Sequence, residues 1–388
     1  MCIGIAATIV RQVSKRWDVA VAVPIAALAI SSWEPFASAS TWMPHTYIAP
    51  FLLLTVAVAA VAAARWNALW MLVFAGGLLV HGHVSFVLFV TVSSVFAIGC
   101  GWWLGRRRDS PGPRLRRDIV PALGVLAVFV APMIANLIVD WPGPYGDYLK
   151  FSTDRTDFPD RSLGDVVQFV FRYWTGGSAW WGAAIAASAA VTVILWHRQR
   201  REFRVFVATL SGAIVLETFL LAFYGYRGVD LLGEIYVGFF AFSGPALVLA
   251  LGMMSVVGAT VRVLATTLAR LGLVAAAVVV LASGQFTNPY RGWLNMDQVA
   301  DQVEAPLVRV DFATGGWPWG VGLVEELRRR DVPVCVVNPV WDLVVTDELV
   351  CDDGPAPSDA ESIFVFGPGE ERFGDPVIDQ DGIAVSRL

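Results

Sequence analysis

The residue of greatest chemical interest is a glutamate inside a long apolar stretch. Glu217 lies in the run Ile214-Val215-Leu216-Glu217-Thr218-Phe219. An ionisable group within a membrane segment is costly, so such groups mark substrate, ion or proton pathways or form internal pairs. Two interpretations stay open. Glu217 contacts a substrate, an ion or a proton inside a helical bundle, or it pairs with Arg227 one loop away.

Three histidines are further candidates. His81-Gly82-His83 lies between two hydrophobic runs, where neutral imidazole can accept a proton or bind a metal, and the glycine permits a close backbone approach. The alternative is a pair of interfacial side chains bonded to backbone or lipid headgroups. His45, in Trp42-Met43-Pro44-His45, either anchors a helix start or lies at a pocket rim. A divalent metal is a candidate cofactor, but this histidine spacing is a weak metal signal.

Carboxylates, aromatic residues and turn residues are concentrated in the segment 140–165. It contains Asp140, Asp147 and Arg155. On an extracytoplasmic loop this composition suits a polar ligand such as a sugar, and a carboxylate there could be a general base or a metal ligand. The alternative is a solvated, turn-rich loop whose acids keep it soluble.

The composition indicates which elements must position these residues. Of the 388 residues, 56% are hydrophobic and 16% are charged, and the mean hydropathy is +0.61. A soluble domain carries about 25% charged residues, so the chain is predicted to be a membrane protein. The net charge of −5 argues against nucleic acid as a partner.

The charges divide the chain into two parts. Residues 1–284 hold 21 Lys and Arg against 14 Asp and Glu, whereas residues 285–388 hold 7 against 19. This shift predicts a multi-helix transmembrane domain over 1–284 and a separate polar, acidic domain over 285–388.

A mainly α, polytopic bundle of about 8–10 helices is expected in the first part. A membrane-spanning helix needs roughly 20 mostly apolar residues. The candidate segments are 18–32, 46–64, 66–81, 83–104, 118–139, 178–196, 205–224, 235–257 and 271–283, with residues 2–10 as a stub of one more helix. The segment 66–81 either spans or folds back. Leu163–Trp174 is amphipathic and suits the plane of the interface.

The loop charges predict the orientation. Simple alternation places 16 Lys and Arg on one side, and these residues favour the cytoplasm. The expected location is therefore the plasma membrane, with multiple passes and an extracytoplasmic C-terminal domain. Lys15-Arg16, the apolar run 19–30 and Ala37-Ser38-Ala39 resemble a signal peptide, but the apolar stub before the basic pair favours a retained helix.

The C-terminal part alternates strand and helix patterns. Leu307–Phe312, Val332–Val337 and Ser362–Phe366 are predicted strands, and Trp319–Arg330 is a predicted amphipathic helix. The pattern indicates a small α/β layer. Cys335 and Cys351 are a candidate disulfide pair outside the membrane, with two free thiols as the alternative.

The order of these motifs resembles a known family. A Trp-x-Pro-His element (Trp42–His45), a helix ending in His81-Gly82-His83, an Arg-rich loop, a Trp-Pro-x-Pro-x-x-Asp loop (Trp141–Asp147) and an α/β tail follow one another. Together they look like actinobacterial polytopic membrane proteins of the GT-C glycosyltransferase type, over roughly residues 17–350.

The resemblance implies transfer of a sugar from a polyprenyl-phosphate donor to a cell-envelope glycan or lipid acceptor. Such a transfer needs a base for the acceptor hydroxyl and positive groups or a metal for the leaving phosphate. The outer basic residues available for the phosphate are Arg155, Arg161 and Arg227. His81 and His83 could bind phosphate or a metal, and Asp140 and Asp147 could orient sugar hydroxyls. In such enzymes an acidic residue of the first extracytoplasmic loop is usually the catalytic base. The first outer loop here, 33–45, contains only Glu34 as an acid. The chain is thus expected to be a member that lacks this N-terminal part, and no catalytic base is assigned.

Two other functions remain as alternatives. The first is a membrane transporter or lipid flippase, for which the deep position of Glu217 is the supporting feature. The second is a non-catalytic scaffold whose outer domain binds a partner in the cell envelope.

Overall fold

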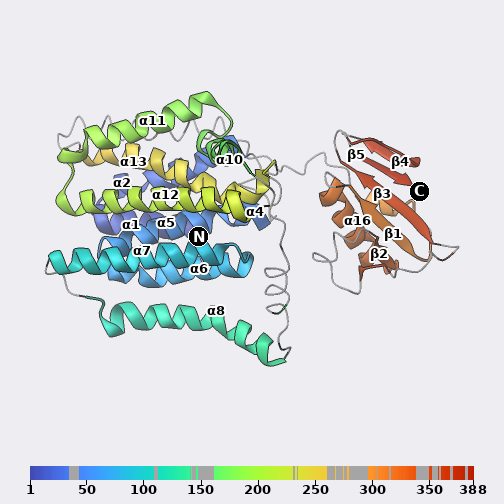
Figure 1. Cartoon of the computed structure of the whole chain (residues 1–388), viewed down its shortest axis with the longest axis horizontal. Helices are drawn as coiled ribbons and strands as arrows, with labels where there is room; N and C mark the ends of the chain where they lie inside the picture. The colour runs from blue at the N-terminus through green and yellow to red at the C-terminus, as the bar shows by residue number, and fades with distance from the viewer. Residues whose placement is uncertain are drawn as a thin grey trace. The chain divides into compact units, whose positions relative to one another are not determined.

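A computed structural model describes most of the chain and divides it into two compact units, Met1–Pro289 and Tyr290–Leu388. The described residues are 1–34, 43–108, 112–139, 141, 146, 161–229, 232–233, 235–259, 267, 274, 278, 296–303, 305–313, 316–337, 349–351, 357, 360–367, 370–380 and 383–388. The first unit is helical and the second contains a sheet (Figure 1).

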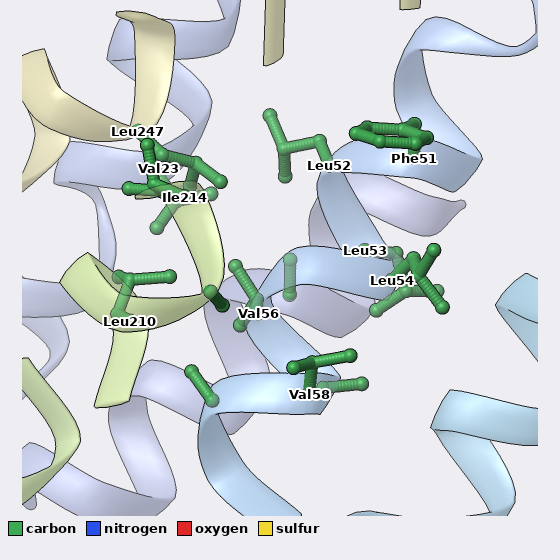
Figure 2. Packing of buried hydrophobic residues seen from close by; sticks show 14 of the residues in the cluster. Val23, Phe51, Leu52, Leu53, Leu54, Val56, Val58, Leu210, Ile214 and Leu247 are labelled. Atoms are coloured by element: carbon green, nitrogen blue, oxygen red, sulfur yellow. The ribbon is translucent and has the colours of Figure 1, made fainter. Parts of the chain in front are cut away.

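The centre of the first unit is α5 (Ile48–Ala62), which is buried from Phe51 to Ala62. Its sequence is apolar on every side, as expected for a helix surrounded by other helices. It packs against α1 (Cys2–Ser14), α6 (Leu69–Gly82), α7 (Phe86–Arg107) and α12 (Arg201–Arg227). Figure 2 shows α5 side chains such as Leu52 and Val56 beside Leu210 and Ile214 of α12.

The remaining helices lie around this core. They are α2 (Trp17–Ala20), α3 (Ala22–Trp33), α4 (Met43–Thr46), η2 (Trp66–Ala68), η3 (Leu115–Ile119), α8 (Val120–Val139), α10 (Leu163–Thr175), α11 (Ala179–Ile194), η4 (Trp196–Arg198), η5 (Ile235–Phe242) and α13 (Ser243–Ala259). The helices predicted from hydropathy are therefore present where the structure describes the chain. The prediction at 271–283 lies outside the described residues, apart from Val274 and Val278.

The number of long helices is lower than the sequence suggested. Within the described part of the chain, five helices are long and apolar enough to cross a membrane, and six if α10 and α11 form one broken span. These two helices meet at 79°, where Gly176 and Gly177 have φ of 53° and 72°. The segments 2–14, 17–30 and 66–82 are helical but shorter than a full span.

The bundle has two chemically different ends. Tyr47, at the start of α5, donates a hydrogen bond to the carbonyl of Gly82 at 2.6 Å, so the His81-Gly82-His83 turn lies at this end, called the histidine end. Arg65 follows the other end of α5 and lies near Arg108 and Arg201, and this is called the arginine end. The 15 residues of α5 separate the two by about 22 Å.

The second unit contains a five-stranded sheet of order β2-β1-β3-β5-β4. Its strands are β1 (Val308–Phe312), β2 (Val334–Val336), β3 (Glu361–Phe366), β4 (Asp375–Gln380) and β5 (Ile383–Arg387). β1 is parallel to β2 and β3, with Val308 opposite Val334 and Glu361, while β5 is antiparallel to β3 and β4. The sequence analysis predicted the first three strands and missed the antiparallel pair.

One helix covers the centre of this sheet. α16 (Trp317–Arg329) connects β1 to β2 and packs with α15 (Met296–Ala300). Gly320 permits the close approach, because a Cβ there would overlap the ring of Phe312. Cys335 and Cys351, the predicted candidate pair, form a disulfide.

Candidate functional site

The deepest ionisable group of the bundle is Glu217 of α12, whose side chain is buried. The Oγ1 of Thr55 in α5 donates to its Oε2 at 2.6 Å, and no described atom bonds its Oε1. A buried carboxyl group with one unsatisfied oxygen is costly in an apolar interior. Binding of a further hydrogen-bond donor or a cation to that oxygen is therefore strongly favourable.

The suggested pairing of Glu217 with Arg227 does not occur. Both residues lie on α12, ten positions apart, which places them about 15 Å apart along the helix axis. The guanidinium of Arg227 instead lies over the ring of Tyr226, with 4.9 Å between the Cζ atom and the ring centroid. The segment predicted from hydropathy ended at residue 224, whereas α12 extends to Arg227.

A second carboxylate contact lies at the histidine end. Nε2 of His45 is 3.4 Å from Oε1 of Glu34, and both side chains are largely buried, with exposures of 4% and 14%. The imidazole stacks on Phe239 of η5 with the ring centroids 4.8 Å apart. Among the described residues this is a buried carboxylate–imidazole pair, the arrangement that enzymes use for general acid–base chemistry.

A row of aromatic rings runs from this pair to the bend between α10 and α11, where an apolar groove begins. Phe239 packs on Phe242 at 5.9 Å, Phe242 on Trp33 at 5.7 Å, and Trp33 edge-on to Trp181 at 5.4 Å. Trp33 immediately precedes Glu34 and also fills the space above Gly176, where a Cβ would meet its ring at 2.6 Å. The bend between α10 and α11 is thus fixed beside the Glu34–His45 pair.

The groove runs along α11, between α10, α12 and α13, and has a volume of about 840 Å³. Its wall is mainly apolar, with Ile185, Val215 and Leu251 along its length and Trp174, Thr175 and Ser178 near the α10–α11 bend. Val215 is exposed, so the groove opens on the outside of the bundle. A long apolar chain with a polar head fits such a shape.

The histidine turn has structural partners. Gly82 lies against the ring of Tyr47, which is the close approach that the glycine permits. His81 donates from Nε2 to the carbonyl of Phe129 in α8 at 2.8 Å. Nδ1 of His83 accepts from the backbone N–H of Ser85, just before α7, at 3.2 Å. Partial exclusion of water lowers the pKa of His83 below its ordinary value.

Polar side chains also tie the α10 region to the end of α12. The guanidinium of Arg161 donates to the carbonyls of Gly225 and Val229. Tyr173 donates to the carbonyl of Ile235 at 2.7 Å, and Arg172 to that of Gly233 at 3.1 Å. These contacts place three outer basic residues, Arg161, Arg172 and Arg227, on one end of the bundle.

Several predicted site residues cannot be placed. Asp140, Asp147 and Arg155 lie outside the described residues. Within the described part, no three His, Cys, Asp or Glu side chains gather as a metal site. The predicted residues that are described occupy four separate environments rather than one cluster: Glu217, His45, the two turn histidines, and Arg227.

Two partners were not among the predicted site residues. Thr55 is the only polar side chain in α5, and this isolation is the signal that could have identified it. Glu34 is the only acid of the segment 33–45, and its contact with His45 depends on the chain folding back on itself.

No protein-family model, no curated protein and no solved structure matches the chain.

Proposed function

We propose that the chain is an integral membrane glycosyltransferase of the GT-C-like type, which transfers a sugar from a polyprenyl-phosphate donor to a cell-envelope acceptor. The observation that carries the proposal is the buried Glu34–His45 pair, from which a row of aromatic rings leads to the α10–α11 bend at one end of an apolar groove. In this proposal the arginine end of the bundle faces the cytoplasm of a plasma membrane, the side that basic residues favour. The C-terminal domain is extracytoplasmic in this proposal, as the alternation of the loop charges predicts.

Each part of the site suits one requirement of the reaction. The groove of about 840 Å³ accommodates part of an isoprenoid chain. The Glu34–His45 pair accepts the proton of the acceptor hydroxyl as its oxygen attacks the anomeric carbon and the polyprenyl phosphate leaves. Arg161, Arg172 and Arg227 supply positive charge near the departing phosphate. Asp140, Asp147 and Arg155 complete the sugar and phosphate contacts in this proposal.

The proposal is tested with the full chain in nanodiscs, a panel of polyprenyl-phosphate hexoses and a cell-envelope glycan or lipid as the acceptor. Release of polyprenyl phosphate that depends on both the protein and the acceptor is expected for the wild type. Glu34→Gln and His45→Gln lower the rate by about 10² to 10⁴, the usual contribution of a general base. Glu325→Gln, an exposed site on α16, is the matched control. Wild-type rates in both site variants would remove the pair from the mechanism.

Transport is the second candidate, and the Glu217–Thr55 contact favours it. Buried carboxyl groups between membrane helices are used for proton and ion coupling. Substrate- or proton-dependent flux in sealed vesicles that is lost in Glu217→Gln would support this function. A wild-type chain that neither releases polyprenyl phosphate nor moves solute would support the envelope scaffold.

A further inference from the structure

The arginine end of the bundle contains a pocket that none of these functions uses. It has a volume of about 430 Å³ and lies between the end of α5, the end of α7, η3 and the start of α12. Five arginines line it, together with two acids. The arginines are Arg65, Arg108, Arg114, Arg117 and Arg201, and the acids are Asp118 and Glu202.

The two acids are already engaged. Glu202 accepts from Arg65 at 2.6 Å. Asp118 accepts from the side chain of Arg117 at 3.0 Å and from the backbone N–H of Arg114 at 2.9 Å. Among the described residues, Arg108, Arg114 and Arg201 have no carboxylate partner, so the pocket carries an excess of positive charge.

The arginines of the pocket repel one another. The pKa of Arg108 is lowered, first by partial burial and then by the nearby charges of Arg201 and Arg65. Helix α12 adds to the positive potential, because it begins at Arg201 without a side-chain cap and directs its free N–H groups to this end.

Neighbouring arginines show the ordinary arrangement for a membrane surface. Arg106 and Arg107 lie outside the pocket lining, with their guanidinium groups over the rings of Trp102 and Trp103 at 5.1 and 4.1 Å. The accumulation of basic residues on a cytoplasmic side requires only this arrangement. It does not require arginines from four separate elements to converge on one concavity.

The geometry points to a binding site for a phosphate-bearing anion in this pocket, with Arg108 and Arg201 as its principal contacts. Guanidinium groups form paired, charge-assisted hydrogen bonds with phosphate oxygens, and an anion relieves the repulsion among them. The phosphate belongs to a soluble ion or to the headgroup of an anionic lipid. The site lies about 22 Å from the proposed catalytic pair, so the two can be tested separately.

The test uses the full chain in phosphatidylcholine nanodiscs and follows its thermal unfolding midpoint. One arm adds inorganic phosphate, with potassium chloride at equal ionic strength as the salt control. The other arm replaces part of the lipid with phosphatidic acid. A rise in the midpoint in either arm is expected, and the arm that responds identifies the source of the phosphate.

Variants decide whether the pocket is responsible. Arg108→Gln and Arg201→Gln are each expected to weaken binding about tenfold or more, since a hydrogen bond to a charged group contributes about 1.5–3 kcal/mol. Arg107→Gln, the matched control, is expected to keep wild-type binding. Without the anion, Arg108→Gln is expected to unfold at the same or a higher temperature, because it removes repulsion. Equal binding in Arg107→Gln and Arg108→Gln, or no response in either arm, would overturn the proposal.

Discussion

Oγ1 of Thr55 lies 2.6 Å from Oε2 of Glu217, although 162 positions separate the two residues in the chain. This hydrogen bond joins α5 to α12 in the middle of the bundle. This hydrogen bond contributes to the stability of the fold because the carboxyl group is buried. If the donor is removed, no water molecule can take its place.

Thr55→Val is therefore expected to destabilise the protein by about 1–3 kcal/mol, the cost of an unsatisfied buried polar group. Thermal unfolding in one detergent measures the effect. Thr218→Val is the control, since Thr218 bonds only the carbonyl of Ile214 in its own helix at 2.7 Å. A double-mutant cycle with Glu217→Gln should give a coupling energy of about 0.5–3 kcal/mol. Additive effects would contradict the contact.

Gly82→Ala is expected to cost about 1–3 kcal/mol, because its Cβ would overlap the ring of Tyr47 at the histidine end. Gly99→Ala in α7 is the matched control, with no atom within 4 Å of the added carbon. That substitution should stabilise the helix by about 0.5–1 kcal/mol. The unfolding midpoints of the two variants should move in opposite directions, and equal shifts would refute the close approach.

The disulfide predicts a defined count of reactive thiols. The sequence has four cysteines, and Cys335 and Cys351 are bonded, which leaves Cys2 and Cys100 free. Alkylation of the denatured, unreduced chain should add two groups by mass spectrometry, and four after reduction. A bond that closes a loop of this length contributes about 3 kcal/mol in the chain-entropy model. Cys335→Ala should destabilise the C-terminal unit accordingly, whereas Cys100→Ala should not affect it.

The protonation of His83 should depend on the fold. Its pKa is lowered because its surroundings partly exclude water, so the folded state favours the neutral imidazole. The contribution of neutral His83 to the free energy of unfolding is fully present above the ordinary, unfolded-state pKa of about 6.5. It is lost as the pH falls through the lower pKa of the folded state. Because the chain has four histidines, NMR of histidine-labelled protein can assign this titration with His83→Asn. A midpoint at or above 6.5 would contradict the prediction.

The elements of the fold could be predicted better than their contacts. The long apolar helices and the strands β1 to β3 follow from hydropathy and β-propensity. Strands β4 and β5 could not be predicted in this way. Their segments, Asp375–Gln380 and Ile383–Arg387, are short and mix polar with apolar residues, and Pro376 suits only an edge strand.

The candidate sites show the same limit. Glu217 is conspicuous in the sequence because it is charged within an apolar run. Its partner Thr55 could not be deduced, because α5 is apolar on all sides and no hydrophobic periodicity shows which face meets α12. The arginine pocket depends on the folding together of distant segments, and the Glu34–His45 pair depends on the local geometry of the chain. Composition and spacing specify neither.

Helix α8 is largely uncovered by the part of the chain that the structure describes. Only 6% of its most apolar stretch is buried, and Leu126, Val128 and Ile138 are exposed. It packs against α6 (Figure 1). Phe129 of α8 lies against Gly77 and accepts the hydrogen bond of His81. Contiguous apolar surface of this kind is not stable in water. We therefore expect the choice of detergent during extraction to determine whether α8 stays packed against α6. The surrounding amphiphile covers the apolar surface of α8 and so contributes to the free energy of folding.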